Sequence, residues 1–164
     1  MIDEPIKKMI MADHDHLIIP ANLVANVMVK NDCYHAFLVL TKVGYSKVPV
    51  LDNDQHLCGL VSLSMITEHM LDTDHVASEN LRRLTVADVM QTDFRSIEDP
   101  TDLEEIMHLL IDDNFVPVVS DEKTFTGIIT RRELLKRMNY LAHNFSEQYD
   151  VRPLLKSVEN NSGR

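Results

Sequence analysis

Two adjacent arginines, Arg131 and Arg132, stand where the sequence predicts the start of a helix. Thr130 and Glu133 flank them with the Thr-x-x-Glu spacing of a capping box, which would close the N-terminus of that helix. Cations in a first helical turn are disfavoured by the helix dipole, so we expect a negative group close by. A phosphate would suit the position, because free backbone N–H groups and two guanidinium groups can donate hydrogen bonds to its oxygens. Ion pairs with surface carboxylates are the alternative, since the chain carries 26 acidic residues.

Other candidate chemistry is sparse. His14 and His16 form a His-x-His pair, but a metal site would need a further ligand, and no second pair of His or Cys residues supplies it. The remaining histidines are scattered without a paired nucleophile. The four glycines form neither the phosphate-binding loop of nucleotide hydrolases nor the dinucleotide-binding fingerprint. We therefore predict no catalytic residues, no metal and no enzymatic activity.

Length and composition narrow the class of protein. A chain of 164 residues can bury a hydrophobic core as one domain or as two small, closely packed domains. Its net charge of −10 argues against a nucleic-acid or anionic-membrane surface, which needs clustered Lys and Arg. Cys33 and Cys58 lack the spacing of a metal or redox pair, so we expect buried, reduced thiols in a cytoplasmic protein. No apolar run is long enough to span a membrane.

The elements that would hold the two arginines occur twice in the chain. The Val-Pro-Val at 48–50 returns at 116–118, and the Gly-Leu-Val-Ser at 59–62 returns as Gly-Ile-Ile-Thr at 127–130, both 68 residues later. Such a period is too long for the common short-repeat solenoids. We interpret the chain as an internal duplication that forms two compact units.

Each half has the pattern of a β-α-β-β-α unit. In the first half we expect a strand within 24–29, a helix from a cap at Asn31 or Asp32 to Gly44, strands at 46–51 and 57–61, and a helix starting at Ser62 or Ser64. In the second half we expect a short helix at 86–90 after Thr85, a strand at 94–97, a helix over 103–111, strands at 115–119 and 124–129, and a helix from 131 to about 145. Before both halves we expect a leader helix and an extended segment at 17–19. The predicted divisions are a leader helix at 1–16, a first repeat at 17–73, a connector at 74–84, a second repeat at 85–145 and a C-terminal tail at 146–164.

These motifs resemble those of a known family. The doubled pattern of an apolar strand with Pro-Val, a Gly-led strand ending in Ser or Thr, and a following helix is similar to a tandem pair of cystathionine-beta-synthase (CBS) domains, over residues 18–144. The segments 24–29, 38–52 and 127–132 further resemble the small stand-alone CBS-pair proteins of Firmicutes that bind cyclic di-AMP. The resemblance implies a mixed α/β (α+β) fold in which two β-α-β-β-α CBS repeats pack as one pseudo-symmetric Bateman module.

The resemblance also implies a function. It implies a non-enzymatic, cytoplasmic homodimer that senses cyclic di-AMP without a cofactor and regulates other proteins by contact. The (p)ppGpp synthetase/hydrolase of the stringent response and pyruvate carboxylase are the partners it suggests. An energy sensor for AMP or ATP is one alternative, and a constitutive protein-interaction scaffold with a vestigial cleft is another.

The nucleotide cleft that the resemblance implies lies between the two repeats. Its expected residues are Val24, Ala25, Val27, Tyr45, Ser46, Lys47, Thr130, Arg131 and Arg132. Ala25 and Ser46 would present backbone groups to adenine, and Tyr45 could stack on a base. Tyr45 could equally fill the corner between a helix and a strand, and a lysine such as Lys47 often only keeps a strand edge soluble.

A symmetry-related second cleft would be built from Ser62, Met65, 94–97 and 115–117. Many adenosine-binding CBS pairs carry an Asp where this chain has Met65 in the first repeat and Glu133 in the second. Met65 cannot accept a hydrogen bond from ribose as a carboxylate does. We therefore predict that the second cleft is empty and that each chain has one site.

Overall fold

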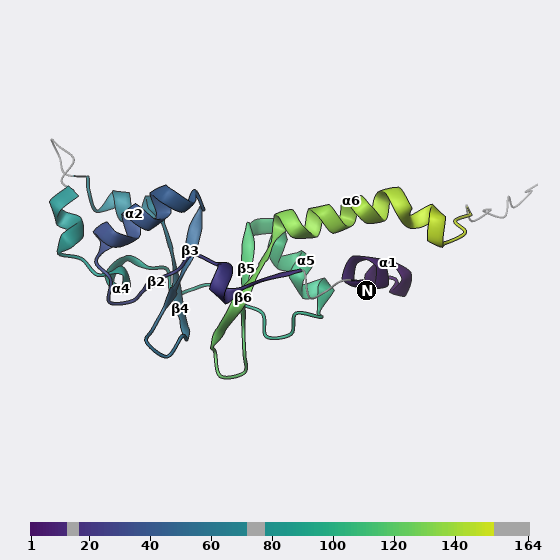
Figure 1. The fold of residues 1–164 in the computed structure, drawn as a ribbon, viewed down its shortest axis with the longest axis horizontal. Coiled ribbons are helices and arrows are strands. Elements are labelled where there is room, and N and C mark those ends of the chain that lie inside the picture. Colours follow the sequence, from purple (N-terminus) through teal and green to yellow (C-terminus); the bar gives the residue numbers. More distant parts are fainter. Residues whose placement is uncertain (13–16, 72–77, 153–164) are drawn as a thin grey trace, which may run out of the picture.

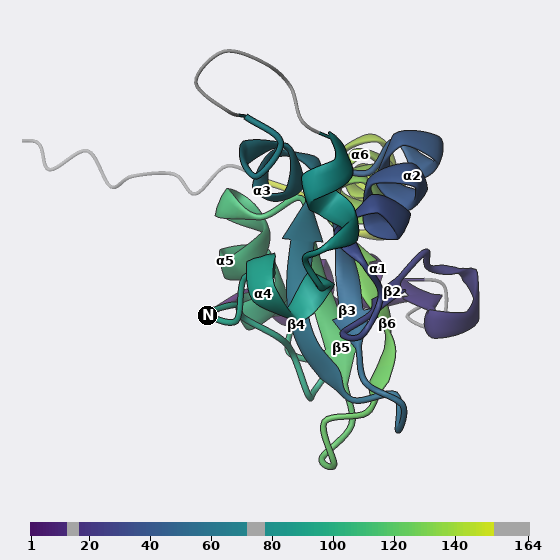
Figure 2. The ribbon, with the colours of Figure 1, turned by 90° about the vertical axis from the view of Figure 1, so that its left-hand side faces the viewer.

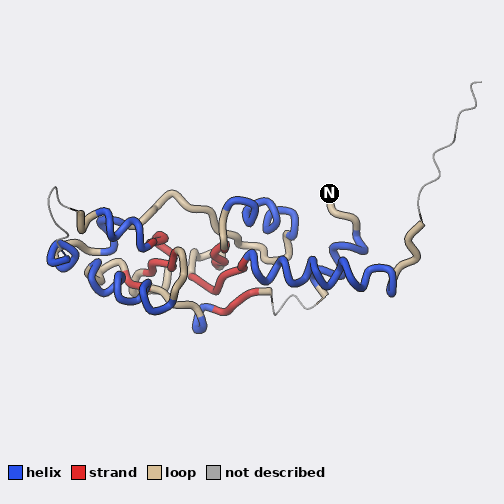
Figure 3. The backbone as a smooth tube through the Cα atoms, turned by 90° about the horizontal axis from the view of Figure 1, so that it is seen from above, coloured by secondary structure: helices blue, strands red, loops and turns tan. Residues whose placement is uncertain are grey.

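Two three-stranded sheets lie face to face at the centre of the molecule, and helices cover the outer side of each (Figure 1). The structure is a computed structural model that describes residues 1–12, 17–71 and 78–152. Seen from above, the strands gather in the middle while the helices lie towards both ends (Figure 3). Figure 2 looks along this stack, with β3 and β4 in front of β5 and β6. The predicted mixed α/β fold of two paired repeats is confirmed.

The first repeat follows its predicted order closely. It comprises β2 (Val27–Met28), α2 (Cys33–Val43), β3 (Lys47–Leu51), β4 (Leu57–Ser62) and α3 (Leu63–Glu68). β3 is the central strand, parallel to β2 and antiparallel to β4.

Local signals set the ends of α2. The Asp32 carboxylate accepts a hydrogen bond from the backbone N–H of His35 at 2.7 Å, which satisfies a donor that the helix itself leaves free. Gly44 ends the helix in the left-handed conformation, with φ 68°. Both predicted caps are confirmed, and α2 delivers the chain to β3 at a defined position.

The second repeat contains α4 (Val86–Val89), α5 (Leu103–Asp112), β5 (Phe115–Val119), β6 (Phe125–Thr130) and α6 (Arg131–Gln148). The strand predicted at 94–97 is wrong in extent, because only Ile97 pairs, through two backbone hydrogen bonds of 2.9 Å to Pro117 and Val119. Arg95 occupies the position equivalent to the buried Val27, and its guanidinium turns outward to Asp112 and Asp113. A charged side chain there leaves too little apolar surface to hold a longer strand against β5.

The third strand of the second repeat's sheet comes from the other end of the chain. β1 (Ile18–Pro20) pairs antiparallel with β6, and the sheet order is β1-β6-β5. The extended conformation predicted before Pro20 is thus confirmed, but its partner lies more than a hundred residues away. The predicted first repeat, residues 17–73, included β1. The predicted boundaries between the leader, the repeats, the connector and the tail stay predictions.

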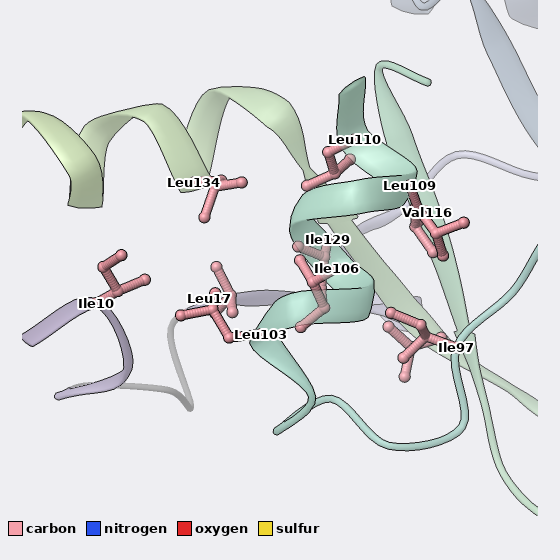
Figure 4. Close-up of a cluster of buried hydrophobic side chains, with 11 residues drawn as sticks. Ile10, Leu17, Ile97, Leu103, Ile106, Leu109, Leu110, Val116, Ile129 and Leu134 are labelled. Carbon is pink, nitrogen blue, oxygen red and sulfur yellow. The ribbon is translucent and has the colours of Figure 1, made fainter. Parts of the chain in front are cut away.

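The leader helix α1 (Glu4–Met11) lies along α6 and buries Ile10 (Figure 1). Figure 4 shows Ile10 and Leu17 facing Leu134 and the apolar side of α5, within one buried cluster. Arg137 of α6 also donates a hydrogen bond to the Ile10 carbonyl oxygen at 2.8 Å. The leader is therefore part of the second repeat's core.

The described residues also contain two short 3₁₀ helices. η2 (Ala21–Leu23) joins β1 to the first repeat, and η3 (Ser78–Arg82) falls in the predicted connector and buries Leu81. Cys33 and Cys58 are both free; Cys33 is buried as predicted, whereas Cys58 is only half-buried. Among the described residues, no helix combines the length and apolar character needed to cross a membrane.

A pseudo-twofold axis relates the repeats, and it is visible in individual contacts. The hairpin turns of the two sheets meet, because Leu57 N–H donates to Lys123 O at 3.1 Å and Phe125 N–H donates to Gln55 O at 2.9 Å. Gln55 and Lys123 share the left-handed conformation, with φ 66° and 65°. The 68-residue offset relates Leu57 to Phe125 and Gln55 to Lys123, so it converts one hydrogen bond into the other and is a symmetry of the folded molecule.

Candidate functional site

A cavity of about 260 Å³ lies between the repeats, where the start of β3 meets the start of α6. Six of the nine predicted site residues line it: Val24, Tyr45, Ser46, Lys47, Thr130 and Arg132. They come from three separate segments of the chain. Apolar side chains from β1, β3, β5 and β6 form most of the remaining wall, together with the polar Asn114 and Glu133, so the cavity has an apolar body and a polar rim.

The polar end of the cavity is the N-terminus of α6. The Thr130 hydroxyl accepts a hydrogen bond from Glu133 N–H at 3.2 Å, while the Glu133 carboxylate pairs with Lys136. Half of the predicted capping box is therefore present. Arg132 is exposed beside this end, with no hydrogen bond or ion pair to any residue that the structure describes. Its guanidinium is free to meet an anion from solvent.

Arg131 has a different environment. Its Nε donates to Leu110 O at 2.8 Å, and one terminal nitrogen donates to Ile111 O at 3.2 Å and Asp113 O at 2.9 Å. These carbonyls form the C-terminus of α5, the negative end of that helix's dipole. The negative group expected near the arginines is, for Arg131, the end of another helix. Arg131 does not line the cavity, and its contact with a ligand stays a prediction.

The predicted site residues Val24, Ala25 and Val27 also differ in whether they line the cavity. Val24 is buried and lines the cavity from the core between the two sheets. Val27 is 1% exposed and lies in the core of the first repeat, away from the cavity. Ala25 is half-buried and lies outside the cavity wall. Ligand contacts by Ala25 and Val27 therefore also stay predictions.

Asn114 is a cavity residue that the sequence analysis did not single out. Its side-chain amide donates to the Ser46 hydroxyl at 3.3 Å, and the two residues are 68 positions apart. They are therefore equivalent residues that meet across the pseudo-twofold axis. Applying the repeat offset to Ser46 would have found Asn114, and applying it to Lys47 would have found Phe115, which also lines the cavity.

The symmetry-related cleft is present as two adjoining cavities of about 290 and 340 Å³. They are lined by residues from each of the predicted segments, including Ser62, Met65, Phe94 and Phe115. Ser64 takes the place that Arg132 has in the first cleft. Three aspartates line this side, Asp93, Asp112 and Asp113.

Arg95 and Lys47 are the counter-charges in this second cleft. The Arg95 guanidinium lies 3.4 Å from Asp113 and 3.7 Å from Asp112. The excess of carboxylates disfavours a phosphate, so the arrangement supports one anion site per chain. That this cleft stays empty remains a prediction.

One group of potential metal ligands occurs in the described part of the chain, at the turn between β3 and β4. Asp52, Asp54 and His56 place ligand atoms within 4.8 Å of one another. The Asp52 carboxylate already accepts hydrogen bonds from the backbone N–H groups of Asp54 and His56. These bonds, of which that from His56 has the larger effect, hold the pKa of Asp52 below its ordinary value. The contacts shape the turn. His14 and His16 lie outside the described residues.

Comparison with known proteins shows the class of protein. The CBS domain family matches residues 19–72 and again 86–140. The chain therefore belongs to the CBS domain family and carries two CBS domains in tandem, as predicted.

Particular relatives follow from the same comparison. Cyclic di-AMP receptor B of Bacillus subtilis is 37% identical over 139 residues, which cover 85% of this chain and 95% of the relative. The solved structure of CbpB from Listeria monocytogenes in complex with c-di-AMP is 46% identical, with a TM-score of 0.74 over 80% of this chain and 98% of that one. CbpB from Streptococcus agalactiae is 31% identical, with a TM-score of 0.82 over 93% of this chain and 96% of that one. This chain is thus similar to stand-alone CBS-pair proteins over almost their whole length.

Proposed function

We propose that this chain is a non-enzymatic sensor that binds cyclic di-AMP in the cleft between its two CBS repeats and regulates target proteins by direct contact. The observation that carries the proposal is the cavity between the repeats, with the exposed guanidinium of Arg132 at its polar end, unpaired among the described residues. The similarity to cyclic di-AMP receptor B and to CbpB solved with c-di-AMP supports the choice of nucleotide.

The chemistry of the cavity suits one half of such a nucleotide. Val24, Ile19 and Ile128 would cover the faces of an adenine, while Ser46 and Asn114 offer hydrogen bonds to its edge. Arg132 and the start of α6 would hold a phosphate. The cavity, about 260 Å³, lies just below the usual range for ligand pockets of roughly 300–1,000 Å³. The second half of the nucleotide would therefore extend over the rim, where Tyr45 is 51% exposed and available for stacking.

Titration calorimetry of the purified protein tests the proposal, with AMP, ATP and cyclic di-GMP as comparison ligands. We expect saturable binding of cyclic di-AMP at about one per chain, and loss of that binding in Arg132→Ala. Preference for AMP or ATP would instead make the protein an energy sensor. No binding of any nucleotide would leave a protein-interaction scaffold.

The proposed assembly is a homodimer in the cytoplasm. Its support is the set of large apolar side chains exposed on the outer helices, among them Ile111 on α5, which is 71% exposed, and Leu135 on α6, which is 55% exposed. Sedimentation should give twice the mass of one chain, and Ile111→Glu combined with Leu135→Glu should give the mass of one. A dimer that survives both changes would mean that another surface joins the chains.

The proposed targets are those that the family resemblance suggests, the (p)ppGpp synthetase/hydrolase and pyruvate carboxylase. A sensor must bind its target differently with and without nucleotide, because the two affinities are linked reciprocally. Interferometry against each enzyme, with and without cyclic di-AMP, measures this difference. Equal target affinity under both conditions would favour the scaffold.

A further inference from the structure

Lys47 and its equivalent in the second repeat, Phe115, both line the first cleft and both cavities of the second cleft, and of these two residues Lys47 carries a charge. It stands at the start of β3, next to the pseudo-twofold axis. Its ammonium group donates a hydrogen bond to the side-chain oxygen of Gln91 at 2.9 Å, in a partly buried position. In this structure the positive charge of Lys47 therefore faces the second cleft.

Gln91 is held firmly as the acceptor. Its backbone N–H donates to Leu60 O at 2.8 Å and its carbonyl accepts from Leu60 N–H at 3.0 Å. The approach to β4 is close, because a Cβ on the neighbouring Gly59 would lie 2.8 Å from the Gln91 carbonyl oxygen. The side-chain amide nitrogen donates to the carbonyl of Asp93. With its backbone and its amide nitrogen both fixed, the side-chain oxygen of Gln91 stays directed at Lys47.

Among the described residues, Gln91 is the one hydrogen-bond partner of the Lys47 ammonium group. Lys47 makes no ion pair with a described residue, although Asp93 and Asp113 line the same cavity. A neutral amide oxygen is a weaker partner for an ammonium group than a phosphate oxygen is. A phosphate in the first cleft would therefore attract Lys47 away from Gln91.

We infer that Gln91 is a positioning residue that holds Lys47 in the second cleft while the first cleft is empty, so that a nucleotide phosphate competes with Gln91 for the same ammonium group. The inference rests on the proposed function. Filling the first cleft would then leave Arg95 alone against the aspartates of the second cleft. Occupancy of one cleft thereby changes the charge of the other.

A double-mutant cycle tests the inference, with cyclic di-AMP titrated by calorimetry into the full chain at several salt concentrations. Gln91→Leu removes the acceptor, so cyclic di-AMP should bind about five- to tenfold more tightly. The salt dependence of its affinity should match that of the wild type, because Lys47 contacts the ligand in both proteins once the phosphate is bound. Gln91→Glu replaces the amide with a carboxylate that holds Lys47 more strongly, so binding should weaken by at least as much.

Lys47→Met is the background that isolates the effect. In that background we expect Gln91→Leu to be neutral in affinity and in salt dependence. Thermal melts of all variants confirm that each is folded, and the Gln91–Leu60 bonds are main-chain bonds that no side-chain change removes.

Three results would overturn the inference. If the wild-type protein, Gln91→Leu and Gln91→Glu all bind cyclic di-AMP with the same affinity, Gln91 does not position Lys47. If the two variants keep their opposite effects in the Lys47→Met background, Gln91 acts through something other than Lys47. If the wild-type protein binds no cyclic di-AMP, the proposed function itself fails and the inference fails with it.

Discussion

Two neighbouring arginines at the start of α6 have different partners, although they share a charge and a helical turn. Arg131 donates three hydrogen bonds to carbonyls at the end of α5, whereas Arg132 faces solvent beside the cavity. Removing the Arg131 side chain leaves carbonyl oxygens at the end of α5 without donors, whereas removing the Arg132 side chain leaves no described hydrogen-bonding group without its partner.

Replacing each arginine by methionine should separate stability from binding. We expect Arg131→Met to lower the free energy of unfolding by about 1–3 kcal/mol, because partly buried carbonyls lose charged donors. Arg132→Met should change stability by no more than about 0.5 kcal/mol, as for an ordinary surface site, and should abolish cyclic di-AMP binding. Urea denaturation and calorimetry measure the two quantities. A stable Arg131→Met protein that fails to bind would show instead that Arg131 contacts the ligand.

At the scale of elements, the short strand β1 is held in place by its pairing with β6. It has three residues, and β6 receives it only because Gly127 has no side chain. A Cβ at Gly127 would overlap the carbonyl oxygen of Ile19 and approach the Ile18 side chain to 2.8 Å. β1 also supplies Ile19 to the cavity, so this close contact helps to form the site.

Gly127→Ala should therefore displace β1 from β6 and lower the free energy of unfolding by about 1–3 kcal/mol. Hydrogen exchange should speed up at the amides of β1 in particular, and cyclic di-AMP should bind more weakly. Gly44→Ala is the matched control, because an added Cβ at Gly44 would have no atom within 4 Å. Its cost is that of placing alanine in the left-handed backbone conformation, about 1 kcal/mol of unfolding free energy. It should leave exchange in β1 unchanged. Equal exchange in β1 for both variants would contradict the proposed contact.

At the scale of the whole molecule, the two repeats are not separate folding units. The second repeat takes β1, Leu17 and Ile10 from the start of the chain into its sheet and core. The first repeat meets it through Val24 and Leu51, which pack with Phe125 and Ile128 between the sheets. Folding of the second repeat thus requires contacts that span most of the sequence.

A chain of residues 85–152 alone should lack a cooperative thermal transition, because one strand of its sheet and part of its core are missing. Joining residues 1–24 to the front of this chain should restore one. Near-ultraviolet circular dichroism on heating measures both. A cooperative transition in the shorter chain would show that β1 and α1 are dispensable to the second repeat.

Local and repeated features of this fold could be predicted from the sequence. The caps of α2 at Asp32 and Gly44 depend on residues a few positions apart, and so does the hydroxyl of Thr130 that begins α6. The duplication needs only a comparison of the chain with itself. From these features came the strand pairs of each repeat, whereas the six predicted residues that line the cavity came from the resemblance to CBS pairs.

The rest depends on contacts between residues far apart in the chain, which composition and periodicity do not encode. Only the tertiary structure paired β1 with β6, because a three-residue extended segment can add to any free sheet edge of suitable shape. Only packing turned Arg131 to the end of α5 and Lys47 to Gln91, since a long flexible side chain takes whichever acceptor the fold brings within reach. The sequence by itself determined which residue types stand near the cleft, and the tertiary structure decided where each of them points.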